Sequence, residues 1–346
     1  MKRVLLAILT LLTATAMWAY SGLYISQSTI GNGLDSQTIT ALAKDRLGRL
    51  WIGSNVGVTV ISNGKITNIR DMASEGGLVI LGKISSIVCT DNPLISSVDR
   101  ILHYDIKADS ALTVRFHGNL LHTDDFLLED QVVTFYDKES RALYAYDMDK
   151  HICSQVAVFK NNNYAFSKIV RSDKDSLNLY LADDMLGVFR YNRTDGTLNR
   201  VNEIPAPIDA KATITDNSNT LWISFPGNGI AGYYIGSGYE KIAEYNTSNC
   251  DMLSNEVSII APLPDGNLLI SQADAGTCVI NRKQINNKID IELIRDLKNV
   301  TTLLTNQNEK ETLFGTLRHG LISMKRTMIG QIRHLHEQQE IGRAHV

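Results

Sequence analysis

The chain has 346 residues, of which 44% are hydrophobic and 21% are charged. These values exclude the low-hydrophobicity, high-charge composition of a disordered chain, and the length suits two average domains or one large all-β domain. Basic and acidic residues nearly balance, at 34 and 37, so no basic stripe is available to neutralise a phosphate backbone. Nucleic acid is therefore not an expected partner.

The N-terminal residues 1–19 have the pattern of a secretory signal peptide. Lys2 and Arg3 give a positive start, residues 4–16 are apolar except for threonines, and Ala14 and Ala16 provide small residues for cleavage. The alternative is an uncleaved membrane anchor, but the apolar stretch is shorter than the roughly 20 residues that span a bilayer. We expect an exported chain whose leader is removed.

A repeated motif begins at Gly33. Asp45 and Gly48 fit the first and last positions of a tight turn, because aspartate accepts a local hydrogen bond and glycine tolerates positive φ. Residues 50–52 form a short apolar run, which is typical of a strand whose two faces are both buried between neighbouring sheets. Asn63 and Gly64 then form a strong two-residue hairpin signal. The motif predicts four short strands in succession.

Six further copies of this motif follow along the chain. Trp222 and the turn at Gly266 mark the two best of them, and the others are degenerate. The residues aligned with Trp51 are separated by 40 to 47 positions and are Ile95, Phe135, Tyr180, Trp222, Leu269 and Phe314. Periods of this length are typical of propellers and solenoids.

The repeats predict an all-β fold, a β-propeller of about seven four-stranded blades over residues 20–338. No helical pattern of 10 to 15 residues separates the strands, which argues against alternating β and α elements. A four-stranded sheet cannot bury both faces alone, whereas packing against neighbours around an axis does so. Residues 23–29 are expected either to add an outer strand to the last blade or to act as a linker.

The first copy resembles the two-component regulator propeller repeat. The matching residues keep the order and spacing of that repeat and are Gly33-Leu34, Asp45, Gly48, Trp51-Ile52-Gly53 and Gly57-Val58. The resemblance implies a periplasmic sensor of a hybrid two-component regulator in a Gram-negative bacterium, which detects polysaccharide fragments. It also implies a longer protein, in which a second propeller and a β-sandwich domain follow this one. In that protein, further domains would contact the membrane, and the full-length chain would form a homodimer.

None of those further domains is visible in the sequence. Residues 341–346 read as the translation of a common sequencing adapter, so we expect residues 339–346 to be an artefactual tail. The alternative is a genuine polar terminus. The hypothesis of a longer natural protein rests on this tail and on the resemblance.

Sequence motifs for catalysis, cofactors and metals are weak. The glycine pattern of residues 227–232 fits a dinucleotide fingerprint, but a strand follows it where a helix is required. Asp124-Asp125 and Asp183-Asp184 are predicted to be solvated turn carboxylates, and His334 and His336 lack a third metal ligand. We therefore expect a chain that is not an enzyme and that has no cofactor and no metal.

The turns between the second and third strands are the predicted ligand-binding face. They should emerge on one face of the propeller, and their side chains differ while the framework repeats. The ordinary alternative is that polar residues simply belong in turns. The predicted ligand-binding residues are Asn55, Asp99, Lys138, Asp184, Asn228, Asp274, Arg318 and His319.

Three functions are consistent with the sequence. The first is a periplasmic sensor input that binds an oligosaccharide or docks onto an adjacent propeller. The second is a stand-alone exported propeller for protein assembly, and the third is a propeller enzyme that acts on glycans. The four cysteines, Cys89, Cys153, Cys250 and Cys278, are free thiols or include one bridge between Cys250 and Cys278.

Overall fold

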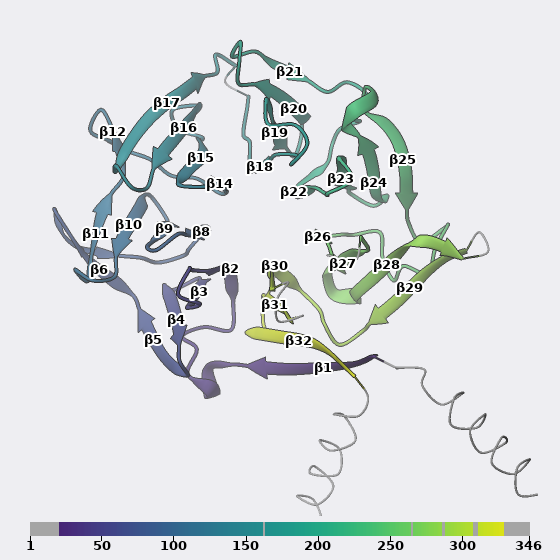
Figure 1. Cartoon of the computed structure of the whole chain (residues 1–346), viewed down its shortest axis with the longest axis horizontal. Helices are drawn as coiled ribbons and strands as arrows, with labels where there is room; N and C mark the ends of the chain where they lie inside the picture. The colour runs from purple at the N-terminus through teal and green to yellow at the C-terminus, as the bar shows by residue number, and fades with distance from the viewer. Residues whose placement is uncertain (1–20, 162, 264–265, 286–287, 307–310, 329–346) are drawn as a thin grey trace, which may run out of the picture. The chain divides into compact units, whose positions relative to one another are not determined.

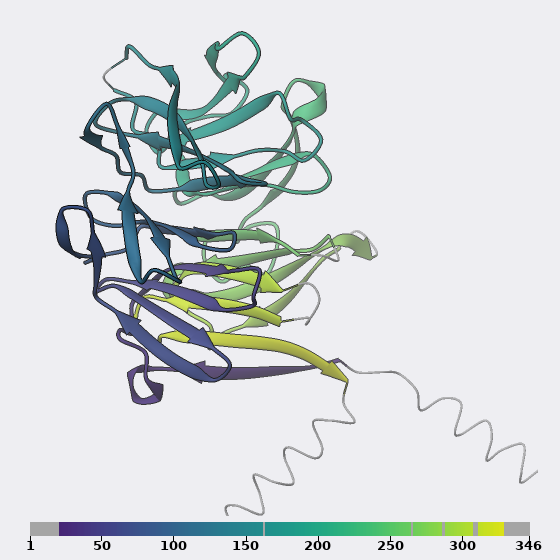
Figure 2. The same cartoon turned by 60° about the vertical axis from the view of Figure 1, so that its left-hand side comes forward.

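The computed structural model describes residues 21–328, except residues 162, 264–265, 286–287 and 307–310. These residues form strands, turns and three short 3₁₀ helices, η1 (Ile30–Asn32), η2 (Ile235–Ser237) and η3 (Ala273–Ala275), and no α-helix (Figures 1 and 2). Within them, no helix has the length and apolar character needed to cross a bilayer. The predicted signal peptide, the predicted tail and the two histidines at 334 and 336 lie outside the described residues.

The first three sheets follow one another along the chain. The first contains β2 (Ile39–Lys44), β3 (Leu50–Ser54), β4 (Val58–Ser62) and β5 (Lys65–Ile69). The second contains β6 (Asp71–Ser74), β7 (Gly77–Ile80), β8 (Ser86–Cys89), β9 (Pro93–Ser96), β10 (Ile101–Asp105) and β11 (Ser110–Thr113). After the hairpin β12 (Arg115–Phe116) and β13 (Asn119–Leu120), the third contains β14 (Phe126–Glu129), β15 (Val132–Asp137), β16 (Ala142–Asp147) and β17 (Ile152–Val158).

The remaining four sheets have four strands each. The fourth contains β18 (Lys168–Val170), β19 (Asn178–Asp183), β20 (Gly187–Asn192) and β21 (Leu198–Arg200). The fifth contains β22 (Asp209–Thr215), β23 (Thr220–Phe225), β24 (Gly229–Tyr234) and β25 (Glu240–Tyr245). The sixth contains β26 (Ile259–Pro262), β27 (Leu268–Gln272), β28 (Gly276–Ile285) and β29 (Lys288–Ile294). The seventh contains β30 (Val300–Asn306), β31 (Glu311–Thr316), β32 (Leu321–Met328) and β1 (Ser21–Ser28).

Two compact units make up the chain. The larger contains residues 27–304 and 314–322, and the smaller takes the described parts of 1–26, 305–313 and 323–346. Within the larger unit, the first strands of consecutive sheets are neighbours from β2 to β26 (Figure 1). Thr301 Oγ1 of β30 donates to the carbonyl of Ile39 in β2, and Ser258 Oγ donates to the carbonyl of Val300 at 3.4 Å. The protein is an all-β, seven-bladed propeller, as predicted, and β1 is the predicted outer strand of the last sheet.

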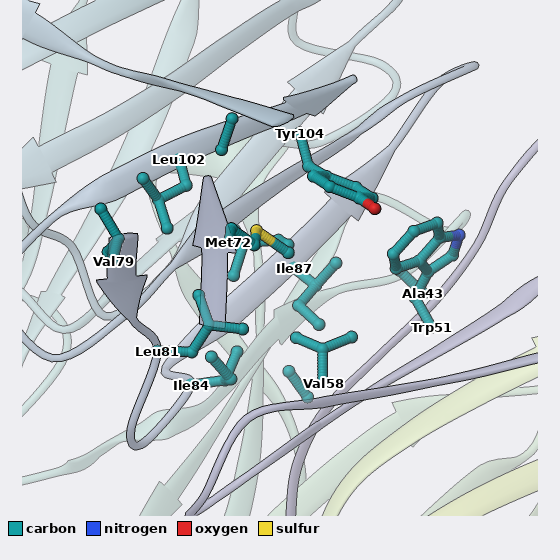
Figure 3. Packing of buried hydrophobic residues seen from close by; sticks show 13 residues of the cluster. Ala43, Trp51, Val58, Met72, Val79, Leu81, Ile84, Ile87, Leu102 and Tyr104 are labelled. Atoms are coloured by element: carbon teal, nitrogen blue, oxygen red, sulfur yellow. The ribbon is translucent and has the colours of Figure 1, made fainter. Parts of the chain in front are cut away.

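Each pair of consecutive sheets from the first to the sixth encloses its own apolar cluster. Between the first two sheets, Trp51 meets Tyr104 edge to face, with ring centroids 6.1 Å apart, in a cluster that also contains Met72 and Ile87 (Figure 3). Trp51 and the six residues aligned with it all lie in the second strand of a four-stranded unit, which is β9 in the second sheet, and each is at most 1% exposed. The repeat therefore identified a deeply buried position in every sheet.

The second sheet differs from the predicted four strands. The hairpin β6–β7 adds to its outer edge, where β6 pairs in parallel with β11 through Ala73 opposite Ser110 and Ser74 opposite Ala111. The polar turn at residues 75–76 is readable in the sequence as a hairpin signal. Which sheet a hairpin joins is decided by packing rather than by its own residues, so the six-stranded order was not predicted.

Replacing Gly229 with alanine is expected to destabilise the protein more than the same change at Gly64, although both glycines have similar positive φ angles. At φ 82°, a Cβ atom there would lie 2.3 Å from the carbonyl oxygen of Tyr245, whereas at Gly64, with φ 75°, nothing lies within 4 Å. Gly64→Ala should cost about 1 kcal/mol, from the positive φ alone, and Gly229→Ala about 2 kcal/mol. Urea unfolding of both variants measures the difference, and equal losses would contradict the close contact.

All four cysteines are free thiols. Burial raises the pKa of Cys153 and of Cys278 to about 12. Cys250 and Cys278 belong to the same apolar cluster, between the fifth and sixth sheets, without being bridged. Of the two alternatives that the sequence left open, the structure has the free thiols and not the bridge between Cys250 and Cys278.

Candidate ligand-binding site

The turns between second and third strands lie at the same end of each sheet as the segments that lead from one sheet to the next. This follows from the antiparallel order repeated in each sheet, and hydrogen bonds between the two kinds of segment confirm it. In five sheets, a buried polar residue at the end of the second strand bonds to the segment that enters its own or the next sheet. These bonds are Ser97 Oγ to Leu81 O, His122 N to Asp137 Oδ1 (3.0 Å), Ala165 N to Asp183 Oδ2 (2.7 Å), Ser224 Oγ to Val257 O (3.0 Å) and Gln272 Nε2 to Ser254 O (2.6 Å).

These buried residues make the face rigid. Asp137 illustrates the arrangement, because its second carboxylate oxygen also accepts from the backbone N–H and the hydroxyl of Ser140, at 2.8 and 2.6 Å. A buried carboxylate that accepts several hydrogen bonds holds the surrounding backbone in place. The side chains next to it in the turn are consequently presented from a fixed loop.

A cavity of about 280 Å³ opens on this face between the second and third sheets. Its walls come from the turn β9–β10, the end of β13 with the segment that follows it, and the turn β15–β16. The lining residues are Val98, Asp99, Leu120, His122, Asp137, Lys138 and Glu139. Two of the predicted ligand-binding residues, Asp99 and Lys138, thus line one cavity.

Two of the charged groups that line the cavity, Asp99 and Lys138, are in ion pairs. Arg100 Nε and Nη2 donate to the two oxygens of Asp99 at 2.8 and 2.6 Å. These hydrogen bonds lower the pKa of Asp99, against an opposing effect of burial. Lys138 Nζ donates to Asp124 Oδ2 at 2.6 Å. Burial acts to raise the pKa of Asp124, but Lys138, Lys211 and His122 outweigh it, so that the pKa is lowered.

The site therefore combines fixed charges of both signs with apolar surface. Asp99 and Glu139 can accept hydrogen bonds and Lys138 can donate them, while Leu120 and Val98 are apolar. Small-molecule sites commonly have such a mixture of apolar walls and a few fixed polar groups.

The other predicted residues lie in the turns of their own sheets and do not line this cavity. Three of them make hydrogen bonds elsewhere: Asn55 Oδ1 accepts from Ser36 Oγ at 2.6 Å, Asp184 Oδ1 accepts from Ala210 N at 2.8 Å, and Asn228 Nδ2 donates to Pro226 O at 3.1 Å. Asp274, Arg318 and His319 are exposed. The structure thus brings two of the eight residues together.

Sequence reasoning missed His122 and Leu120. Leu120 ends β13 and His122 lies in the segment from β13 to β14, so neither is in a turn between second and third strands. The order of strands implies that such segments share a face with the turns, so this signal was present in the repeat. Glu139 lies in the same turn as the predicted residue Lys138.

The prediction that Asp183 is a solvated turn carboxylate is wrong, because it ends strand β19 and is 3% exposed. Asp124 bonds to Lys138, and Asp125 bonds to Lys168 Nζ at 3.1 Å and to the backbone N–H of Ile169 at 3.0 Å. Asp183 is buried and bonded to backbone N–H groups. The glycine pattern at 227–232 lies in the turn before β24 and in that strand. Among the described residues, no three His, Cys, Asp or Glu side chains are grouped to hold a metal.

Residues 33–56 match the sequence family described as two component regulator propeller. The chain carries a two-component regulator propeller repeat. This match covers the copy in which the sequence motif is best formed, including Asp45, Trp51 and Gly53. No curated protein matches the sequence.

Solved structures resemble this propeller over most of its length. The extracellular domain described as that of a hybrid two component system from B. thetaiotaomicron is 14% identical and covers 89% of this chain and 42% of its own, with a TM-score of 0.68. A second extracellular domain from that organism is 16% identical and covers 89% and 40%, with a TM-score of 0.66. A chain of the mitotic checkpoint complex is 11% identical and covers 88% and 94%, with a TM-score of 0.63. At these identities the likeness shows the fold, and this propeller spans about two fifths of the two extracellular domains.

Proposed function

We propose that this propeller is the ligand-sensing part of a periplasmic sensor of a hybrid two-component system, and that it binds an oligosaccharide. The observation that carries the proposal is the cavity in which Asp99, Lys138 and His122 come together from three different segments. A sugar hydroxyl can both donate to Asp99 and accept from Lys138, and the face of a sugar ring can pack on Leu120. The match to the regulator repeat and the likeness to extracellular domains of such systems support the cellular context.

Signalling in this proposal requires domains beyond this chain. The ligand must bind two arrangements of the sensor unequally, since a ligand with equal affinity for both shifts nothing. The cavity lies between two blades, so a ligand that contacts both would favour one spacing of the turns β9–β10 and β15–β16. Export by the signal peptide, a membrane connection through later domains and a homodimer belong to the same proposal.

Replacing Lys138 with alanine is expected to weaken oligosaccharide binding about tenfold. A hydrogen bond from a charged donor contributes on the order of 1.5 kcal/mol, which corresponds to this factor. Titration calorimetry of the mature chain against a panel of plant and host oligosaccharides measures the affinity. Arg318→Ala is the matched control, because Arg318 is an exposed cation in the equivalent turn of the seventh sheet and does not line the cavity.

Two outcomes would count against the proposal. If no oligosaccharide of the panel binds, the ligand class is wrong. If one binds and Lys138→Ala and Arg318→Ala change its affinity equally, the cavity is not the site. We also propose that the chain has no glycan-cleaving activity, which the appearance of new reducing ends during the same incubations would contradict.

Protein assembly is the second candidate function. Its specific support is the likeness to a chain of the mitotic checkpoint complex, of which this propeller covers 94%. In that case the face with the cavity would contact a protein rather than a sugar. A pull-down from an extract of the source cells distinguishes the two, since the sensor proposal expects sugar binding without a protein partner at this face.

A further inference from the structure

The outer strand of the second sheet, β7, has two large apolar side chains in solvent. Leu78 is 69% exposed and Ile80 is 78% exposed, while Val79 between them is buried. Val79 and Leu81 point into the apolar cluster between the first two sheets (Figure 3). One face of β7 is therefore fixed on the core, and the opposite face is apolar and uncovered.

The edge of β7 also has unused backbone groups. Leu81 N donates to Arg70 O at 2.9 Å, and β7 pairs antiparallel with β6 through Val79 opposite Met72. Because hydrogen-bonding direction alternates along a strand, the N–H and C=O groups of Val79 face β6 and those of Leu78 and Ile80 face the free edge. Such an edge is a template for another strand.

Five of the other six outer strands are protected against this kind of pairing, whereas β1, the outer strand of the seventh sheet, has no charged residue. β5, β21, β25 and β29 each have at least one lysine, arginine, aspartate or glutamate, a common device against edge pairing. β17 has no charged residue, but the hairpin β12–β13 lies against it. β7 has neither a charge nor a neighbour on its outer side within the described residues.

The charges that flank β7 favour a particular partner. Glu75 precedes the strand and Lys83 follows it; both are exposed, and neither has an ion pair among the described residues. In an antiparallel arrangement of two identical strands, the Glu75 end of one copy lies beside the Lys83 end of the other, twice by symmetry. In a parallel arrangement, like charges would meet.

We propose that β7 pairs antiparallel with β7 of a second copy of this chain. Leu78 then stands opposite Ile80 of the other copy, and Val79 opposite Val79, so that the free backbone groups of Leu78 and Ile80 complete four main-chain hydrogen bonds. The exposed leucine and isoleucine side chains of both copies form one apolar patch across the pair. The resulting sheet has twelve strands and an isologous interface.

The test is the dissociation constant of the dimer by sedimentation equilibrium, at chain concentrations up to about 1 mM. A short edge interface is expected to have a dissociation constant on the order of 100 µM. Ile80→Pro should weaken the dimer at least about tenfold, because proline removes an N–H that faces the free edge and not β6. Leu47→Lys is the control, since Leu47 is 76% exposed but lies in a turn of the first sheet.

The charge pattern gives a second, more specific result. Glu75→Lys and Lys83→Glu should each weaken self-association about tenfold, since each places like charges together twice. Mixing these two single variants should restore pairing between them, because every contact is then between opposite charges. Circular dichroism and thermal unfolding verify that each variant is folded.

Three results would overturn the pairing. They are a monomer at about 1 mM, a dimer whose dissociation constant is unchanged by Ile80→Pro, and a dimer that Leu47→Lys weakens as much as Ile80→Pro does. Failure of oligosaccharide binding would leave the pairing untouched, because the cavity and β7 are different surfaces.

Discussion

Replacing Trp222 with alanine is expected to lower the free energy of unfolding by about 4 kcal/mol, a typical loss when a buried aromatic side chain is replaced by alanine. Trp222 is fully buried, its ring stacks on Tyr245 at 5.9 Å between centroids, and the guanidinium of Arg282 lies 5.1 Å from the ring centre. Its Nε1 donates to Asp216 Oδ2 at 2.9 Å. Alanine would leave a large cavity between the fifth and sixth sheets and remove one partner of a buried carboxylate.

Two further variants separate the contributions in urea unfolding. Trp222→Phe keeps most of the apolar contact and loses the N–H, so a loss of about 1 to 2 kcal/mol is expected. Leu177→Ala changes a side chain that is 58% exposed and should alter stability by less than about 0.5 kcal/mol. A loss below about 1 kcal/mol for Trp222→Ala would show that the fifth sheet contributes little to the cooperative fold.

Acidification from pH 6.5 to about 4 is expected to destabilise the protein by between about 2 and 3 kcal/mol through His103 alone. Burial, and secondarily the positive charge of His151, lowers the pKa of His103 to about 4, while Asp105 and Asp149 act weakly in the opposite direction. In this range the unfolded chain binds a proton at this histidine and the folded chain does not, so folding loses stability as the pH falls. Below about pH 4 both states are protonated and the loss is complete.

The geometry around His103 explains why protonation is unfavourable. Its Nδ1 is 3.0 Å from Tyr146 Oη, which is also 3.3 Å from His151 Nδ1, and the two imidazole rings lie 4.8 Å apart. Because the rings are this close, a positive charge on His151 disfavours a positive charge on His103. The single hydroxyl of Tyr146 lies within hydrogen-bond distance of both rings.

His103→Gln should remove this part of the pH dependence. The measurement is the difference in unfolding free energy between wild type and variant at several values from about pH 7 to pH 4, because the difference cancels the titration of other groups. His117→Gln is the control, since His117 is an exposed histidine between β12 and β13. Parallel pH curves for the wild type and His103→Gln would contradict the buried neutral state.

The sequence alone predicted the positions that repeat. Asp45 and Trp51 recur as Asp216 and Trp222 at the same spacing, and in both cases the indole N–H donates to the carboxylate at 2.9 Å. The sequence showed the aspartates as turn residues, which they are, but not as acceptors for the buried tryptophan. That role needs the strand and the turn to fold back on each other.

The candidate site could be predicted only in part. Asp99 and Lys138 were recognised because each lies in the same turn of its own repeat, but the repeat gave no reason to choose them over Asp274 or Arg318. The choice depends on which neighbouring turns leave a cavity between them. The hydrogen bond of Asp184 is likewise set by a neighbour from the next repeat, Ala210.

The period of 40 to 47 residues determined by itself that the chain forms seven sheets with buried second strands, because turns and strands are specified by residues close in sequence. The tertiary structure alone decided that β6 and β7 extend the second sheet and that His122 joins Asp99 and Lys138. Those outcomes depend on how one sheet packs on the next, which is a matter of contacts between residues far apart in the chain.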